Sequence, residues 1–525
     1  MSKTAQPTLA GLKRHERRRK QRELREQQKR QSRQYPPTFT LPNRKSDLKT
    51  VEEEKETIQL TTENTLSVYR QLLPSLLQKL SRIPDPRNPK KTKHKMAVMM
   101  LYGLLTFVFQ IPSRRKTNQE MTTPQLLANL QAVFPELTEM PHQDTLCRLL
   151  EKMDVDQIET SYNDMLRRLI RKKTFKSLLH NNRYLVAVDG TQKYIMDECW
   201  DERYLRRKIR DKDGNFKYQY YAYALEAVLL FSNGMVLPLM SVFLENTPEL
   251  EKIENDEEWK QDCELKAFHR LAKRLKRQFP KLPLTLLLDG LYANGPVMEV
   301  CRRNKWKFMI VLKDGSLPSV WQEVKGLMRL DSKGEYRHER TWRGRCQTFK
   351  WVNEIEYDYG VGKHRKRIIV HVVICDESWE EIDQNAQVVI KTARHAWILS
   401  DPIERENVHE YCNLGARKRW LHENNILKEK HQGYHYEHIF SHDWNAMRGY
   451  HYLMHIARML NEMVLHSIYL TEQVKTVGIQ SFIKKNHIVM IHRELDTERL
   501  RRLLESPGQL RLVHEDNWKT SRSVA

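Results

Sequence analysis

Hydrophobic residues recur at every third or fourth position over the early part of the chain. Segments such as VYRQLLPSLLQKL, PQLLANLQAVF and MLRRLIRKKTFKSLL share this spacing, which is typical of amphipathic helices because it gathers apolar side chains on one face. We therefore predict a helical N-terminal domain over residues 46–180. Its basic residues around Arg87–Lys95 make DNA binding a hypothesis for this domain, and a merely solvated helix face is the alternative.

The pattern changes at Arg183, where short apolar runs replace the helical spacing. YLVAVDG, LTLLLDG and KFMIVLKDG each read as a buried strand. Two longer apolar stretches joined at Asn233-Gly234 predict a hairpin, since Asn-Gly supplies the positive φ of a tight turn. With amphipathic helices between them, these strands predict an α/β domain whose first part covers residues 181–317.

Polar and apolar residues then alternate in YRHERTWRGRCQTFKWVNEIEYDYG and RKRIIVHVVICDE, so we predict a β-rich insertion over residues 318–396. Helical spacing returns over residues 397–476, which would complete the α/β domain. Residues 477–525 are basic and weakly patterned, and we expect a C-terminal tail. Residues 1–45 are rich in Lys, Arg and Gln, which predicts a disordered basic arm that folds on a partner or stays solvated.

The charge balance narrows the class of partner. The chain has 90 Lys and Arg against 67 Asp and Glu, a net charge of +23, which favours a polyanion and nucleic acid first. Seven cysteines lie far apart with no CxxC pair, which suggests neither a disulfide framework nor a cysteine zinc site. The start of the chain lacks a secretory signal, and the apolar run Met96–Phe109 is too short to cross a bilayer. We expect a protein of the reducing cell interior, without a membrane partner.

Two acids could carry chemistry. Asp189 and Asp289 each follow an apolar run and precede a glycine, so two strands would deliver two carboxylates to one edge of a sheet. Such acids repel unless a cation lies between them, and Mg²⁺ prefers oxygen ligands and supports phosphodiester chemistry. For either acid alone, a turn after a strand is the alternative. A third acid is expected from a later helix, and Glu423 in GARKRWLHENNILKEK is our candidate.

At these residues the chain resembles the DDE transposases of bacterial insertion sequences, in particular those with a β-strand insertion before the last acid. Their helical motif Tyr-x2-Arg-x3-Glu-x6-Lys is matched at Arg419, Glu423 and Lys430, whereas the tyrosine position holds Ala416. Trp420 also fits the family context, as do the short upstream segments DPRNPKKTKHKMAVMMLYGLL and MPHQDTLCRLLEKM. Arg419, Glu423 and Lys430 would share one helical face; a surface ion pair with a solvated lysine is the alternative.

The resemblance implies a ribonuclease-H-like core in which Asp189, Asp289 and Glu423 hold two Mg²⁺ ions, with Mn²⁺ as a substitute. It also implies metal-dependent cleavage at transposon ends and strand transfer into target DNA. The residues that it implies for DNA contacts are Arg419, Trp420 and Lys430. The partner would be double-stranded DNA, bound by a homodimer in the bacterial cytoplasm at the nucleoid. A nuclease of the same fold without strand transfer and an inactive relative that only binds DNA are the alternatives.

Other residues compete for these roles. The alternative third acids are Asp401, Glu404, Glu410 and Glu437, of which Asp401 is the strongest because it also ends an apolar run. Seven histidines lie between His422 and His455, and the spacing of His438 and His442 would let them share a metal on one helix face; phosphate contacts or core packing are the alternatives. The tryptophans that could stack on a base, or lie in the core, are Trp306, Trp397 and Trp444.

Overall fold

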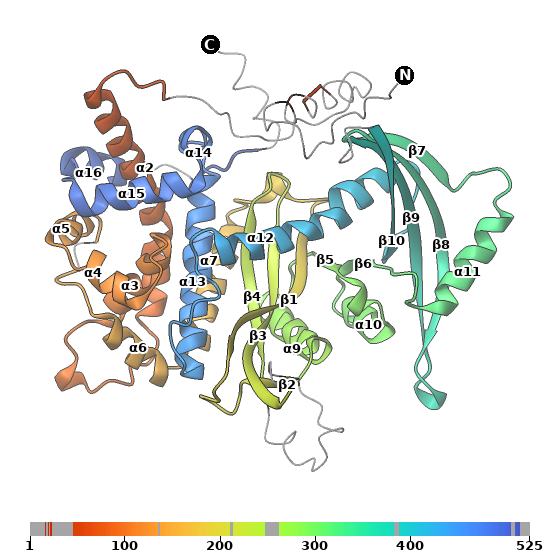
Figure 1. Ribbon diagram of the computed structural model, residues 1–525, viewed down its shortest axis with the longest axis horizontal. Coiled ribbons are helices and arrows are strands. Elements are labelled where there is room, and N and C mark those ends of the chain that lie inside the picture. Colours follow the sequence, from red (N-terminus) through yellow and green to blue (C-terminus); the bar gives the residue numbers. More distant parts are fainter. Residues whose placement is uncertain are drawn as a thin grey trace, which may run out of the picture. The chain divides into compact units, whose positions relative to one another are not determined.

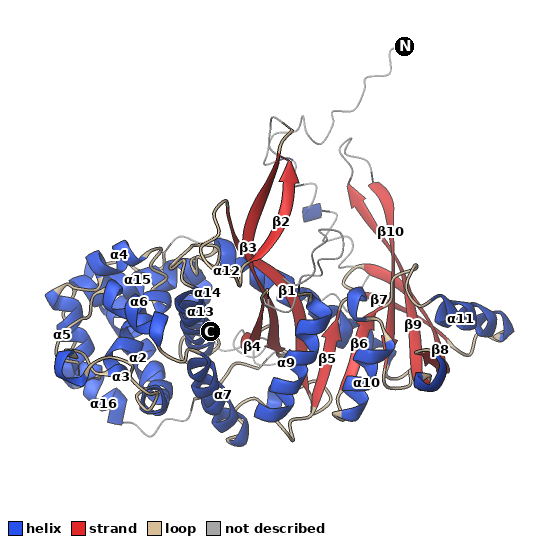
Figure 2. Ribbon diagram, turned by 90° about the horizontal axis from the view of Figure 1, so that it is seen from below, coloured by secondary structure: helices blue, strands red, loops and turns tan. Residues whose placement is uncertain are grey.

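The computed structural model describes residues 46–134, 137–210, 214–246, 262–382, 388–505 and 510–514, together with Glu16, Arg19, Arg22 and Glu23 (Figures 1 and 2). Apart from those four residues, the predicted basic arm lies outside the described part. The chain divides into two compact units. We call residues 41–284 and 418–525 the larger unit, and the unit that contains residues 285–417 the smaller unit.

The larger unit begins with the predicted helical region. Its helices are α2 (Val51–Leu80), α3 (Met96–Val108), α4 (Arg114–Glu120), α5 (Pro124–Val133), α6 (Gln143–Lys152) and α7 (Asp156–Arg171), with short 3-10 turns at Pro89–Lys91 and Lys176–Leu178. Thr50 and Glu53 form a capping box that fixes where α2 begins. The apolar helix α3 is buried at nearly every position, as a core helix should be. None of the helices in the described ranges is long and apolar enough to cross a membrane.

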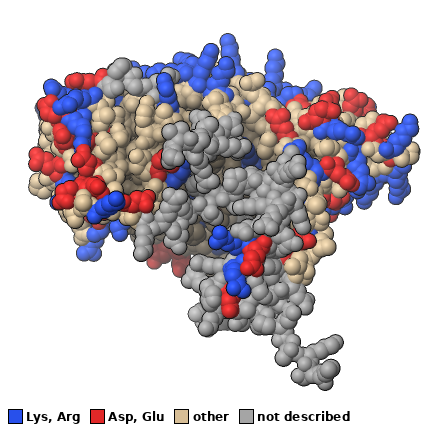
Figure 3. Space-filling model, turned by 90° about the horizontal axis from the view of Figure 1, so that it is seen from above, with Lys and Arg blue, Asp and Glu red and all other residues tan. Residues whose placement is uncertain are grey.

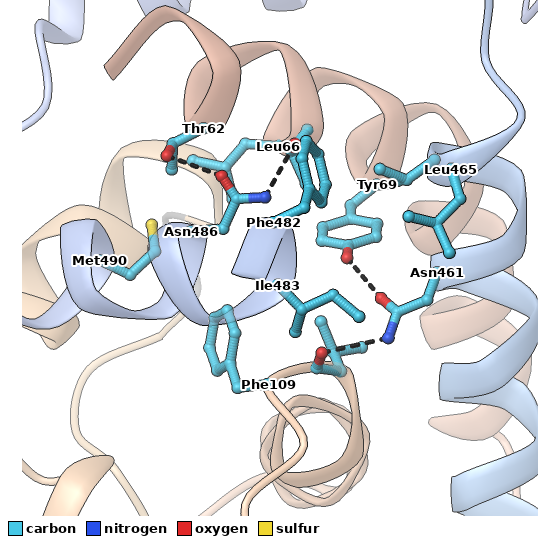
Figure 4. A pocket seen from close by; sticks show the side chains of 13 residues that line it. Thr62, Leu66, Tyr69, Phe109, Asn461, Leu465, Phe482, Ile483, Asn486 and Met490 are labelled. Carbon is cyan, nitrogen blue, oxygen red and sulfur yellow. Dashed lines mark hydrogen bonds between the residues drawn. The ribbon is translucent and has the colours of Figure 1, made fainter. Parts of the chain in front are cut away.

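The C-terminal part of the larger unit is helical, and its last two helices lie within residues 477–525, where we expected a weakly patterned tail. Four helices follow one another: α13 (Trp444–Leu465), α14 (Thr471–Val477), α15 (Ile479–His492) and α16 (Thr497–Glu505). Helices α15 and α16 both pack on α2. Figure 4 shows the small cavity where α2, α3, α13 and α15 meet. The Tyr69 hydroxyl donates to Asn461 Oδ1 at 2.7 Å there, and the Thr62 hydroxyl donates to Asn486 Oδ1 at 2.9 Å. These polar groups satisfy one another, so the cavity is a packing site between helices.

The strands of the larger unit are β1 (Tyr184–Met196), β2 (Leu205–Arg210), β3 (Phe216–Leu230) and β4 (Val236–Leu244). β3 pairs antiparallel with each of the other three. The hairpin predicted at Asn233-Gly234 joins β3 to β4, and Gly234 has the positive φ of 84° that this turn requires. The long helix α13 and the amphipathic helix α9 (Glu264–Gln278) both pack on β4, which explains why every residue of β4 is buried.

The smaller unit holds a mixed sheet with the strand order β5-β6-β10-β9-β8-β7. Its strands are β5 (Leu284–Leu288), β6 (Lys307–Val311), β7 (Arg337–Trp342), β8 (Arg345–Tyr359), β9 (Lys366–Ile382) and β10 (Val388–Leu399). β5 and β6 run parallel and are joined through α10 (Gly295–Arg303), whereas the other neighbours are antiparallel.

The segment expected to be β-rich begins with a helix, α11 (Pro318–Leu330). The buried side chains of α11 are Val320, Trp321 and Val324. Their spacing places them on one face of the helix. Together, the two units make the chain a mixed α/β protein with a helical N-terminal region. This confirms the predicted fold class at the level of mixed α/β. The ribonuclease-H-like description and the domain boundaries stay predictions.

Candidate active site

Asp189 lies within β1, opposite Glu226 of β3. Its Oδ1 accepts the backbone N–H of Gly190 at 2.9 Å, and its side chain is 23% exposed. We expected the strand to end at this acid, but β1 continues to Met196 because its pairing with β3 continues to Tyr220. Asp189 is therefore preceded and followed along β1 by residues that pair with β3.

Gly190 has a packing reason to be glycine. A Cβ at this position would lie 2.6 Å from the Glu264 carboxyl group and 2.6 Å from the Tyr223 hydroxyl. Those two groups are hydrogen-bonded to each other at 2.6 Å. The close approach fixes the chain directly after Asp189 against the β3 and α9 side chains.

Arg419 brings Asp189 and Glu423 together within the larger unit. Glu423 lies in the first turn of α12 (Trp420–His431), and Arg419 precedes this helix. Arg419 Nη2 donates to Glu423 Oε1 at 2.7 Å, and Arg419 Nη1 donates to Asp189 Oδ2 at 3.4 Å. Arg419 is only 8% exposed, whereas the Glu423 side chain is 33% exposed. Two partly accessible carboxylates from distant segments thus share one buried cation, which offsets their mutual repulsion.

The donor set of these acids fits a hard divalent cation. Carboxylate oxygens are the ligands that Mg²⁺ prefers, and Mg²⁺ keeps several waters when it binds to one or two carboxylates. Asp189 and Glu423 both offer oxygens and are both partly exposed, so ligands from solvent or substrate could reach them. Arg419 holds a positive charge between the two acids in the described structure.

Asp289, the other predicted acid, lies in the smaller unit directly after β5. Its Oδ1 accepts the N–H of Leu291 at 2.9 Å and caps the short 3-10 turn Gly290–Tyr292. The alternative interpretation, in which the acid belongs to a turn after a strand, therefore describes the local geometry of Asp289 correctly. Gly290 packs against the aliphatic chain of Lys313, because a Cβ there would approach within 2.8 Å. The structure brings together two of the three predicted acids, and a shared site with Asp289 stays a prediction.

The residues expected to contact DNA have different environments. Trp420 is 57% exposed, and the Arg419 guanidinium carbon lies 5.3 Å from the centroid of its ring. Lys430 pairs instead with Glu437, with 2.9 Å between Nζ and Oε1, and its side chain is only 18% exposed. Trp420 is thus the accessible member of this group, while Arg419 and Lys430 are both engaged by carboxylates.

Asp401, the strongest rival for the third acid, has structural partners in the smaller unit. It follows β10 and accepts from the Lys307 ammonium group and from the Tyr411 hydroxyl, the latter at 3.3 Å. These contacts tie the end of β10 to β6 and to the segment before α12. They give Asp401 a clear role in holding the strand end.

The structure corrects the expectation for His438 and His442, because both lie in the loop between α12 and α13 and share no helix face. α12 ends at His431, and Gly433 then adopts a φ of 100°, which turns the chain out of the helix. His442 stacks on Trp200 with 4.4 Å between ring centroids. His438 packs edge-on against Phe440.

A different histidine cluster lies in the core of the larger unit. His451 and His455, one turn apart on α13, place their Nε2 atoms 3.8 Å and 3.6 Å from Oε1 of Glu226. The three residues could hold a metal ion, and two imidazoles with one carboxylate would suit zinc better than Mg²⁺. All three are buried. Sequence spacing missed this group because Glu226 comes from a strand far from the helix.

Protein groups already contact this cluster. The Tyr436 hydroxyl donates to Glu226 Oε1 at 2.6 Å, and the Ser241 hydroxyl lies 2.9 Å from His451 Nε2. The Lys193 ammonium group lies 3.5 Å from His451 Nδ1. Burial raises the pKa of Glu226 and lowers the pKa of Lys193, while the attraction between their charges opposes both shifts. Lys193 supplies positive charge beside Glu226, so a metal is not required to balance the carboxylate.

The tryptophans considered for base stacking are in the core. Trp306, Trp397 and Trp444 are 3%, 5% and 0% exposed, which favours the packing alternative. On the face drawn in Figure 3, Lys and Arg side chains gather along one edge, whereas acidic and basic side chains mix over other parts. The excess positive charge is thus unevenly spread over that face.

Residues 77–165 match the family model DDE_Tnp_1-associated, a domain that occurs in DDE-type transposases. The match runs from the end of α2 into α7 and so covers the helical N-terminal region. No curated protein matches the chain. The family match and the acids therefore lie in separate stretches of the sequence and are independent observations.

Proposed function

We propose that the protein is a DDE-type DNA transposase whose ribonuclease-H-like domain uses Asp189, Asp289 and Glu423 as its metal-binding acids. The observation that carries the proposal is the pair of partly exposed carboxylates, Asp189 and Glu423, gathered around Arg419. The DDE_Tnp_1-associated match in the helical region supports it independently. Asp289 joins the proposal as the acid that directly follows strand β5.

Two Mg²⁺ ions, or Mn²⁺ in their place, would supply Lewis acidity at the scissile phosphate when bound to these acids. The chain's own groups would orient the DNA. Arg419 has two N–H groups engaged by carboxylates, and in the loaded site its fork is suited to a phosphate oxygen. The exposed ring of Trp420 would pack on a nucleotide next to the cut. Lys430 would add positive charge on α12 if Glu437 releases it.

The reaction we propose has two displacements at phosphorus. A water oxygen attacks the phosphate at a transposon end, and the bond to the 3′ oxygen breaks, which leaves a 3′ hydroxyl. That hydroxyl then attacks a phosphate of target DNA and forms the new bond, while the target's own 3′ oxygen leaves. Two ends must be held at once, so we propose a homodimer assembled on double-stranded DNA at the bacterial nucleoid.

The test uses a labelled duplex that carries the DNA ends flanking the gene, with and without Mg²⁺. We expect the wild type to cleave and join, and we expect Glu423→Gln, Asp189→Asn and Asp289→Asn each to lose cleavage by about a thousandfold or more while binding the duplex normally, because a missing ligand removes charge stabilisation in the transition state. Asp401→Asn is the matched control and should stay active.

Each other outcome contradicts a stated part of the proposal. Cleavage that survives Glu423→Gln would refute the third acid. Cleavage without joined products would indicate a nuclease of the same fold. A wild type that binds the ends but never cuts them in Mg²⁺ or Mn²⁺ would leave only the DNA-binding alternative.

A further inference from the structure

The strands β2 and β3 form a two-stranded ribbon beyond the rest of the larger unit's sheet (Figure 2). β1 pairs with β3 only as far as Tyr220, and β4 only as far as Tyr223. Among the described strands, Phe216–Gln219 pair with β2 alone. We call Arg206–Arg210 together with Phe216–Tyr220 the β2–β3 ribbon.

One face of the β2–β3 ribbon consists of cations and aromatic rings. Cross-strand partners point to the same side of a sheet, and so do residues two positions apart. The register pairs Arg206 with Tyr220, Lys208 with Tyr218 and Arg210 with Phe216. All six side chains therefore share a side, which we call the cationic–aromatic face. None of the six is acidic or aliphatic.

The rings of this face hold its cations in place. The Arg206 guanidinium carbon lies 5.1 Å from the Tyr218 ring centroid, and the Lys208 ammonium nitrogen lies 4.8 Å from that of Phe216. Arg210 approaches the same Phe216 ring at 5.0 Å. Each of these cations thus lies beside an aromatic ring, an arrangement in which the negative face of the ring attracts the positive charge.

Exposure indicates that the face serves a partner. Phe216 is 60% exposed and Tyr218 is 37% exposed, although aromatic residues usually bury much of their area when their role is packing. The opposite side of the ribbon also carries two cations, Arg207 and Lys217, of which Lys217 pairs with Asp197 at 3.0 Å. Three cations interleaved with three rings suit a polyanion with flat surfaces, and nucleic acid has both.

We propose that the cationic–aromatic face of the β2–β3 ribbon binds duplex DNA through its phosphates. From Arg206 to Arg210 the strand spans about 14 Å at 3.4 Å per residue. A duplex carries one charge per 1.7 Å, so about eight phosphates lie along that length. A two-stranded β-ribbon also fits the major groove of B-form DNA.

The position of the face connects it to the acids. Counting by twos along β3 from Tyr220 leads to Glu226, which pairs with Asp189, so this side of the sheet is the one that faces Arg419 and α12. Six residue steps of strand are about 20 Å, or about six base pairs of duplex. DNA on the ribbon would run toward Asp189. The inference requires that DNA be the partner of the protein, as the proposed function does, but it does not require that the acids cut it.

The test measures how the affinity of the full chain for a labelled duplex of random sequence depends on salt, by fluorescence anisotropy in EDTA so that nothing is cleaved. The slope of log K against log salt is negative for the wild type. For Arg206→Gln/Lys208→Gln/Arg210→Gln, we expect the magnitude of this slope to decrease by up to about 2.7, at 0.9 per phosphate contact. Between 50 and 200 mM salt the variant would then lose roughly 40-fold less affinity than the wild type.

Two control variants separate this site from net charge and from folding. Lys325→Gln/Arg329→Gln/Lys333→Gln removes three exposed cations from the smaller unit and should leave the slope within about one unit of the wild type, since at most one phosphate contact would be involved. Arg206→Lys/Arg210→Lys keeps the charges of the ribbon and should keep the slope. Equal slope losses in the two Gln triples, or none in the ribbon triple, would overturn the proposal.

A single-stranded occupant would give a different result. If Phe216→Ala/Tyr218→Ala weakened binding to a single-stranded oligonucleotide far more than binding to the duplex, the face would be a stacking platform and the duplex proposal would be wrong. Failure of the proposed function is distinguishable, because it concerns cleavage in Mg²⁺ by the Glu423 variant. In a protein that never cuts DNA, the triple Gln variant of the ribbon could still reduce the salt dependence of binding. In a protein that cuts DNA, the same variant could leave the salt dependence unchanged.

Discussion

Arg419 offers a direct test of whether the two acids form one electrostatic unit. We consider Arg419→Met, Glu423→Ala and the double variant. The contact of 2.7 Å between Arg419 and Glu423 joins a buried guanidinium to a carboxylate that is 33% exposed. Hydrogen bonds to charged groups contribute about 1.5–3 kcal/mol, and exposed ion pairs contribute about 1 kcal/mol or less. An intermediate coupling of about 1–2 kcal/mol is therefore expected.

The 3.4 Å contact with Asp189 is longer and should add about 0.5 kcal/mol, toward the low end of the range for a partly exposed pair. The assay is urea unfolding in EDTA at pH 7, with the coupling taken from the double-mutant cycle. Mg²⁺ should then stabilise Arg419→Met more than the wild type, because the guanidinium no longer competes for the same carboxylates. A coupling below about 0.5 kcal/mol, the usual non-additivity of independent sites, would refute the pairing. Equal stabilisation of both proteins by Mg²⁺ would refute the overlap of metal and arginine.

Two further predictions concern the surroundings of the site. Gly190→Ala should destabilise the chain by about 1 kcal/mol, the low end for added atoms in a packed place, because the new methyl group must part Tyr223 from Glu264; unchanged urea unfolding would contradict this packing. Burial, aided by the nearby charge of Lys418, lowers the pKa of His180 to about 4. As the pH falls, the unfolded chain therefore binds a proton at His180 before the folded chain does. The contribution of His180 to the free energy of unfolding is full above about pH 6.5 and is lost as the pH falls toward 4. At pH 5 that loss is about 1–2 kcal/mol. His180→Gln should remove it, His364→Gln at an exposed position should not, and equal pH dependence of all three proteins would refute the assignment.

Local periodicity predicted the elements that depend on local sequence. The helices of the N-terminal region, the strands β1, β5 and β6 and the hairpin at Asn233-Gly234 follow from apolar spacing and turn chemistry. β2 was missed because LRRKIR has only two apolar residues, and its strand conformation comes from pairing with β3. The sequence did not predict α11 because the residues that follow it alternate between polar and apolar, as in strands, and the whole segment was assigned to the β-rich insertion. Helix α15 was read as a tail because its partner, α2, lies far away in the sequence.

The candidate site divides in the same way. The spacing of Arg419 and Glu423 is local, and their ion pair is present. Their meeting with Asp189 is a tertiary contact that the sequence could only predict through resemblance. The cluster of Glu226, His451 and His455 was not predicted, although one signal was available: Glu226 is the single charged residue inside the long apolar run of β3. A charge in such a run must be buried with partners.

The inner face of α12 shows what holds Glu423 in position. Its buried residues include His422, Asn425 and Glu429, so the buried side of this helix is largely polar. Asn425 donates to Glu429 at 2.8 Å, and Arg458 of α13 donates to Asn425 at 2.5 Å. Apolar packing tolerates sliding more readily than directional hydrogen bonds do, since an unpaired buried polar group costs about 1–3 kcal/mol. The contacts of Arg458 with Asn425 and Glu429 therefore restrain the rotation of α12 about its axis, and with it the direction in which Glu423 points.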